Sequence, residues 1–104
     1  MQPKITHLFA ALALVLGAHS VQADPKLAEK NACMICHGVD QKKIGPSYTD
    51  VAAKYAKDKD AVTKLAGSIK AGGSGKWGVI PMPPQAALSE ADSKVLAAWI
   101  MGIK

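Results

Sequence analysis

The sequence predicts an all-α fold, and three observations lead to that prediction. Apolar residues recur at intervals of three and four positions in several segments, which is the spacing of one buried helix face. No segment has the composition of a convincing strand. The irregular stretch at residues 72–88 contains Pro81, Pro83 and Pro84, which exclude both regular helix and sheet. Helices joined by turns around one core define the all-α class.

Two helices are expected in the first part of the domain. Asp24 suits a helix cap and Pro25 suits the first helical turn, and this helix should run to about Cys33. Residues 38–47 contain two glycines and a proline, so they are predicted to form a loop. Apolar residues then recur with helical spacing over residues 48–57, where we expect the second helix.

Two further helices are expected in the second part. Residues 60–71 carry apolar side chains at helical spacing, and Gly72 and Gly73 should end that helix. Ser89 is predicted to cap the last helix, with Asp92 three residues later in a position that resembles a capping box. The apolar stripe of this helix consists of Val95, Leu96, Trp99, Ile100 and Ile103.

Residues 1–23 have the features of a secretory signal peptide. Lys4 supplies a positive start, residues 8–17 form an apolar core, and residues 21–23 match a small-residue cleavage signal. The apolar core, at about 10 residues, is too short to span roughly 30 Å of hydrocarbon, which disfavours an uncleaved anchor. Cleavage would leave one domain, residues 24–104, small enough to need a staple or a cofactor.

The chain is basic, with a formal net charge of +5, and it contains no arginine. Readers of nucleic acid usually rely on arginine for paired contacts to bases, so a nucleic-acid partner is not expected. Excess lysine instead favours docking to acidic protein surfaces, although a solvated basic surface without a particular partner would have the same composition.

The pentapeptide at residues 33–37, Cys-Met-Ile-Cys-His, allows three interpretations. Cys33 and Cys36 lie three positions apart, so on a helical turn they are about 5–6 Å apart on one side and can add to two vinyl groups of one haem, with His37 as an iron ligand. A structural zinc site would need four ligands, and the mature chain offers only two cysteines and one histidine. A thioredoxin-like dithiol would need a preceding strand, which is not predicted. Covalent attachment of haem c is therefore favoured.

Methionine sulfur is the expected second ligand, because His37 is the only histidine after residue 23. Met34 lies inside the attachment motif and cannot reach the opposite face of the haem. Met101 lies near the end of the last predicted helix, where packing is the simpler role. Met82 stands between Pro81 and two further prolines, and such a stiff loop loses little entropy when it presents a ligand. The predicted metal ligands are His37 and Met82.

These residues resemble a known family, the short bacterial class I cytochromes c of the c-551/c-552 type, over nearly the whole mature chain. The matching segments are Asn31 to His37, Ile44 to Tyr48, Asp50 to Tyr55, Gly75 to Pro84 and the helix of Trp99. The resemblance implies four to five short helices around one covalently bound haem, with the first and last helices crossing so that Ala28 and Ala32 lie near Leu96 and Trp99.

The resemblance also implies a function and two further cofactor-binding residues. The protein would be a monomeric electron carrier rather than an enzyme, delivering electrons to terminal oxidases or nitrogen-oxide reductases. The predicted signal peptide places this carrier in the periplasm, without stable membrane insertion. The Pro46 carbonyl would accept a hydrogen bond from His37, and the Trp77 indole would donate to a haem propionate. Lysines near the haem edge, Lys42, Lys43, Lys70 and Lys76, are candidates for steering a redox partner.

Two departures from the family pattern concern tuning of the haem. Gln85 stands where relatives often carry asparagine, whose amide helps to orient the methionine ligand. Ser68 stands where an arginine or histidine often meets a propionate, so we expect a weaker pH dependence of the reduction potential. The alternative function is a haem enzyme or gas sensor in which Met82 detaches and leaves the iron open.

Overall fold

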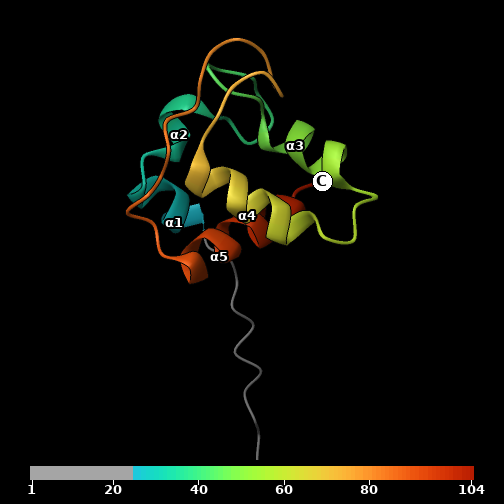
Figure 1. Cartoon of the computed structure of the whole chain (residues 1–104). Helices are drawn as coiled ribbons and strands as arrows, with labels where there is room; N and C mark the ends of the chain where they lie inside the picture. Colours follow the sequence, from blue (N-terminus) through green and yellow to red (C-terminus); the bar gives the residue numbers. More distant parts are fainter. Residues whose placement is uncertain (1–24) are drawn as a thin grey trace, which may run out of the picture.

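The computed structural model describes residues 25–104, and this part of the chain is helical, as predicted (Figure 1). The predicted signal peptide lies outside the described residues, as does Asp24. Residues 25–104 contain five helices and no strand, apart from one isolated antiparallel bridge between Gly73 and Met82. The helices are α1 (Pro25–Lys30), α2 (Cys33–Cys36), α3 (Tyr48–Tyr55), α4 (Ala61–Ala71) and α5 (Glu90–Met101).

The core lies where α4 and α5 pack along one another, with α1 and α3 against α5. Ala28 of α1 is fully buried, which allows this short helix to approach α5 closely. Removal of this apolar surface from water is the main source of stability. The buried apolar side chains are Ala28, Tyr48, Val51, Ala52, Tyr55, Ala61, Leu65, Ala66, Ile69, Leu88, Leu96, Ala97 and Ile100.

Two serine caps set the starts of α3 and α5. The Ser89 hydroxyl accepts a hydrogen bond of 3.0 Å from the Asp92 backbone N–H, so the predicted cap of the last helix is confirmed. The Ser47 hydroxyl accepts from the Asp50 backbone N–H at 3.1 Å in the same way. Each cap satisfies one of the donors that the first helical turn leaves unpaired.

The prediction of one helix from residue 24 to about Cys33 is wrong, because the chain turns between α1 and α2. Ala32 adopts a left-handed conformation with φ of 59°, which no helix continues through. The Asn31 side chain donates to the Leu27 carbonyl at 2.8 Å and satisfies the end of α1. Ala32 is consequently exposed, so only Ala28 of the two predicted alanines lies in the core.

Two segments without helix lie together above the helices in Figure 1, residues 39–46 and 72–84. We call these two segments the cover, and α1, α3, α4 and α5 the scaffold. Within the second segment, Gly73 and Met82 exchange two backbone hydrogen bonds of 3.0 and 2.8 Å, and the chain between them forms a loop. The predicted exclusion of regular structure by the prolines agrees with this arrangement.

Candidate haem site

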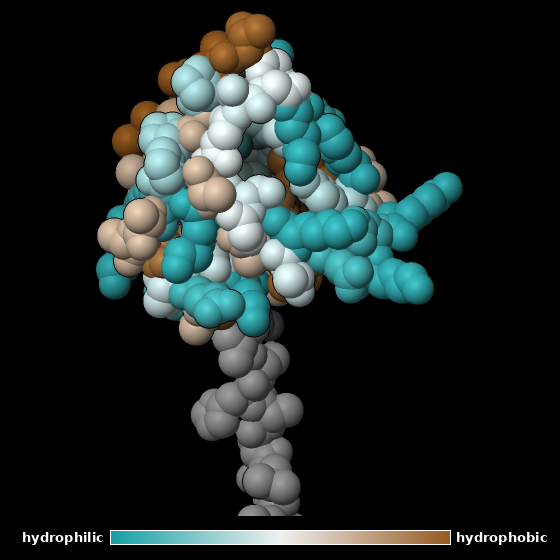
Figure 2. Space-filling model, in the orientation of Figure 1, coloured by the Kyte–Doolittle hydropathy of each residue, from teal (hydrophilic) through white to brown (hydrophobic). Residues whose placement is uncertain are grey.

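A cavity of about 730 Å³ separates the scaffold from the cover. Its volume falls within the roughly 300–1,000 Å³ typical of cofactor sites. The space-filling view shows a hollow below the apolar top of the molecule (Figure 2). The scaffold contributes a mainly apolar wall made of Val51, Leu65, Ile69, Leu96 and Ile100. The cavity therefore suits a large, mostly apolar group.

The Cys33 and Cys36 side chains line this cavity as free, half-buried thiols. The single turn of α2 carries both, three residues apart, so they project to the same side. Burial raises the pKa of Cys33, and the Tyr48 hydroxyl partly opposes this by a hydrogen bond to the thiol. The two thiols therefore stand together at one edge of the cavity, where they can bond to a single ligand.

His37 follows α2 directly and also lines the cavity. Its Nδ1 atom lies 2.8 Å from the Pro46 carbonyl oxygen. Because a carbonyl only accepts, Nδ1 of the neutral ring carries the proton and donates it to Pro46. The hydrogen bond implied by the resemblance is therefore present. It leaves the Nε2 lone pair free for a metal, and it increases the electron density of that nitrogen.

Gly45 and Tyr48 hold the His37 ring from two sides. A Cβ atom on Gly45 would approach the ring to 2.5 Å, so only glycine allows the loop backbone to lie against the imidazole. The Tyr48 ring stacks on His37 with centroids 5.1 Å apart and an interplanar angle of 17°. Tyr48 in turn meets the edge of Trp99 at 5.2 Å, which connects the imidazole to the core. The orientation of the ring is thus set by packing as well as by the hydrogen bond.

Met82 reaches the cavity from the cover. The two backbone bonds to Gly73 hold this residue in place, and Gly72 makes the approach possible. Gly72 has φ of 64° and ψ of −158°, a combination open almost only to glycine, and an added Cβ would overlap the Met82 carbonyl oxygen. His37 and Met82, distant in sequence, thus line one cavity from different segments.

Trp77 lines the cavity too, and its side chain is held by Lys54 of α3. The Lys54 ammonium lies 4.4 Å from the ring centroid, within the range of a cation–π interaction. The same ammonium donates to the Lys76 carbonyl at 3.2 Å. These two contacts hold the cover segment against α3.

The two positions that depart from the family pattern also lie in the cavity wall. The Gln85 side-chain amide donates to the Pro83 carbonyl at 3.2 Å, and its backbone N–H donates to the Lys70 carbonyl at 3.0 Å. Gln85 therefore braces the end of the proline segment. Ser68 of α4 lines the cavity without supplying a charge.

Comparison with known proteins identifies the family of this chain. The Cytochrome c family profile matches residues 23–104. Cytochrome c-552 of Nitrosomonas europaea is 54% identical over 96 residues, covering 92% of both chains. Cytochrome c-552 of Hydrogenobacter thermophilus is 52% identical, covering 92% of this chain and 97% of its own. The chain belongs to the cytochrome c family.

Solved structures support the same family. The crystal structure of wild-type Nitrosomonas europaea cytochrome c552 matches with a TM-score of 0.76 and 56% identity, covering 78% of this chain and all of that one. The class I cytochrome MtoD of Sideroxydans lithotrophicus matches with a TM-score of 0.65 and 34% identity. The predicted resemblance and the all-α cytochrome c fold are therefore confirmed.

Family membership selects haem c as the cofactor over the zinc and dithiol alternatives. The cofactor is one covalently attached haem c with its iron, and the protein is an electron carrier that works with redox partners. The observed site fits this group, since it joins paired thiols, an imidazole of defined tautomer, a thioether and a large apolar cavity. Among the described residues, no helix is long and apolar enough to cross a membrane.

Three residues that shape the site, Gly45, Tyr48 and Tyr55, are not identified as site residues by the sequence. Tyr48 was predicted only as the start of a helix, although it contacts both His37 and Cys33. Gly45 was assigned only to a loop, although its position directly before Pro46 indicates a close approach to His37. The contact of Lys76 with Tyr55 joins residues 21 positions apart, and nothing in the sequence indicates that pair.

Proposed function

We propose that residues 24–104 form a periplasmic one-electron carrier in which Cys33 and Cys36 bind the haem covalently and His37 and Met82 are its axial ligands. The observation that carries this proposal is the His37–Pro46 hydrogen bond, which leaves Nε2 free in a cavity that Met82 also lines. When bound, the haem supplies one-electron exchange between ferric and ferrous iron. Two protein ligands would occupy both axial positions and leave no open site for catalysis.

The other predicted site residues would orient the ligands and the haem. Pro46 would act through its carbonyl, which fixes the His37 tautomer and the ring plane. Trp77 would donate its indole N–H to a propionate, since no hydrogen bond among residues 25–104 uses that donor. The same ligands in both redox states would limit structural rearrangement during transfer.

We also propose that residues 1–23 are a signal peptide, which the start of the family match at residue 23 supports. The exported carrier would pass electrons to terminal oxidases or nitrogen-oxide reductases. Exposed Lys42 and Lys43 lie at the rim of the cavity and would steer an acidic partner.

The test is spectroscopy of the mature protein produced in the periplasm with haem c assembly. We expect acid-stable haem and, in the oxidised protein, the far-red band of a methionine–iron bond. Met82→Leu should remove this band and allow carbon monoxide to bind rapidly to the reduced iron. Met101→Leu, a second partly buried methionine, is the matched control and should retain both properties.

The outcomes separate the alternatives. Rapid carbon monoxide binding by the unmodified protein at neutral pH would favour an enzyme or gas sensor with an open iron. Haem that acid extraction removes would contradict attachment through Cys33 and Cys36.

A further inference from the structure

The Lys76 ammonium has an unusual partner on the cavity wall. It lies 2.8 Å from the Tyr55 hydroxyl oxygen and donates to it, and it sits 5.4 Å from the centroid of the same ring. Tyr55 is buried at the end of α3, whereas Lys76 belongs to the cover, and both line the cavity. A positive charge is therefore held at the cavity by a neutral phenol.

Within residues 25–104, no carboxylate balances this charge at the cavity. Among the described residues that line it, none is aspartate or glutamate. The titratable lining groups are the thiols of α2, then His37, Lys42 and Lys43 of the loop, Tyr48 and Tyr55 of α3, and Lys76; α4 and α5 contribute none. Lys54 adds a further positive charge beside the same wall. The lysines at this wall, without a carboxylate among the described lining residues, make the cavity suitable for an anion.

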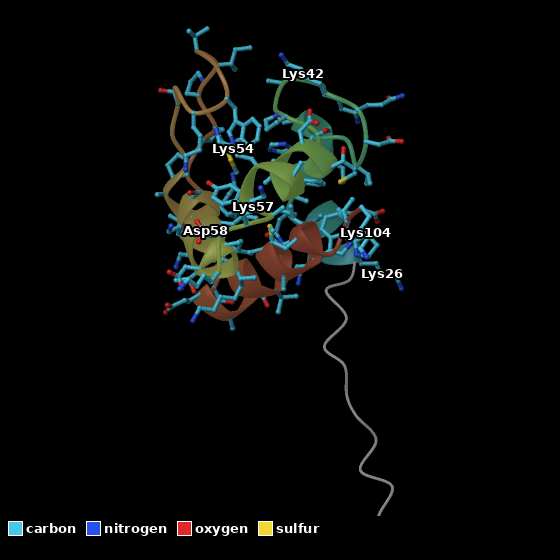
Figure 3. All side chains as sticks on the ribbon, turned by 90° about the vertical axis from the view of Figure 1, so that its right-hand side faces the viewer. Lys26, Lys42, Lys54, Lys57, Asp58 and Lys104 are labelled. Atoms are coloured by element: carbon cyan, nitrogen blue, oxygen red, sulfur yellow. The ribbon has the colours of Figure 1, made fainter. Side chains whose placement is uncertain are left out.

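Lys76 is better placed for this role than the other two lining lysines. Lys42 and Lys43 are exposed on the first cover segment, and the Lys43 ammonium is bonded to the Met34 carbonyl at 3.0 Å. Lys54 holds the backbone of Lys76 through the carbonyl oxygen, and its ammonium lies over Trp77. Figure 3 shows Lys54 on α3 beside the second cover segment, with Lys57 beyond the end of that helix. The Lys76 ammonium and the Trp77 indole therefore border the same part of the cavity.

A haem carries two propionate carboxylates, and a partly desolvated carboxylate needs a cation or hydrogen-bond donors. The polar α4 residue in this wall is Ser68, whose side chain carries no charge. We propose that Lys76, held by the Tyr55 hydroxyl, is the counter-ion of a haem propionate. This inference rests on the proposed function, because it requires the haem in this cavity. The Tyr55 hydroxyl, which accepts from Lys76, keeps its own proton to donate to the same anion.

The test is the reduction potential of the holo-protein between pH 4 and pH 9, compared with that of Lys76→Gln. An adjacent cation lowers a carboxyl pKa by about 1–3 units, so the pH-dependent part of the curve should lie at acid pH in the unmodified protein. Loss of Lys76 should move the pH range in which the reduction potential changes upward by about 1–3 pH units. Lys76→Arg should restore the original curve, and Tyr55→Phe should give a smaller upward shift.

The matched control is Lys57→Gln, which removes an exposed lysine two positions after Tyr55 that does not line the cavity. It should leave the pH-dependent part of the curve in place. Curves of Lys76→Gln and Tyr55→Phe that coincide with that of Lys57→Gln would overturn the proposal. Absence of covalent haem or of the methionine–iron band from the unmodified protein would instead contradict the proposed function.

Discussion

The scaffold and the cover enclose the same cavity but are built in opposite ways. The scaffold contains nearly all of the buried apolar side chains, and α4 and α5 pack along one another. The cover contains no buried residue, and it exposes Val79, Ile80 and Ile44, with Val79 92% exposed. Apolar surface at the top of Figure 2 marks this difference.

The comparison shows that the two regions owe their order to different interactions. Packing of its own side chains stabilises the scaffold. The cover is held by a few backbone hydrogen bonds and by the close backbone approaches that Gly45 and Gly72 allow. The contacts of Lys54 and Lys76 also join it to α3. Since it buries little apolar surface of its own, we infer that the haem supplies most of its ordering energy.

The strongest test of this comparison removes covalent attachment with Cys33→Ser and Cys36→Ser together. We expect loss of covalent haem and of amide protection at Gly73, Gly75 and Met82, whose N–H groups are hydrogen-bonded within the second cover segment, because the cover then lacks its packing partner. Hydrogen exchange of α4 and α5 should retain measurable protection. Ile35→Ser, an exposed change in the same turn, should preserve haem and protection. A cover that stays protected without haem would contradict the comparison.

A second test truncates one side chain in each region. Leu96→Ala should lower the free energy of unfolding by about 2–5 kcal/mol, because Leu96 is only 2% exposed and its loss leaves a cavity in the scaffold. Val79→Ala should change it by no more than about 0.5 kcal/mol. Urea unfolding of the haem-bound proteins measures both values. Equal losses at the two positions would show that the cover is packed as tightly as the scaffold.

A third test uses one glycine from each region. Gly72→Ala should destabilise the protein by about 1–3 kcal/mol, since the Gly72 conformation is nearly closed to other residues and a Cβ meets the Met82 backbone. Gly67→Ala, in the middle of α4 with open space around it, should stabilise by about 0.5–1 kcal/mol. Only the first change should also weaken the methionine–iron band. If urea unfolding showed that both substitutions stabilise the protein, or that both destabilise it, the proposed difference between the two glycines would be refuted.

The smallest effect concerns an exposed ion pair between α4 and the turn that precedes it. The Lys64 ammonium donates to Asp58 at 2.8 Å, and this bond, with the Asp60 backbone N–H, lowers the pKa of Asp58. The ionised Asp58 therefore stabilises the folded state above its unfolded pKa of about 3.9. This stabilisation disappears as pH falls through the lower folded pKa. Asp58→Asn should be slightly less stable than the unmodified protein at pH 7 in low salt. The difference should vanish at pH 2 and in high salt, as thermal unfolding would show.

The sequence predicted the helices with strong periodicity, because their apolar faces are local patterns. The sequence predicts the Ser89 cap of α5 but not the Ser47 cap of α3, and α3 ends at Tyr55 rather than at about Lys57. The break at Asn31 and Ala32 was not predicted. Alanine favours helix by itself, and its left-handed conformation results from joining α1 to the turn that holds the two cysteines.

The candidate site divides in the same manner. The spacing of Cys33, Cys36 and His37 and the prolines around Met82 are visible in the chain, since the chemistry depends on residue type and local order. The tautomer of His37, by contrast, depends on a carbonyl nine positions away. The Tyr48 stacking and the Lys76–Tyr55 bond bring together different segments.

The sequence by itself therefore determined the fold class, the attachment motif, the candidate ligands and the family, because each is encoded by neighbouring residues or by a helical period. Only the tertiary structure decided that α1 and α2 are separate, that Gly45 and Tyr48 clamp the imidazole, and that Lys76 brings a positive charge to a cavity that residues 25–104 line without a carboxylate. These features arise from backbone approach and charge placement across distant segments. Local propensity carries no information about such contacts.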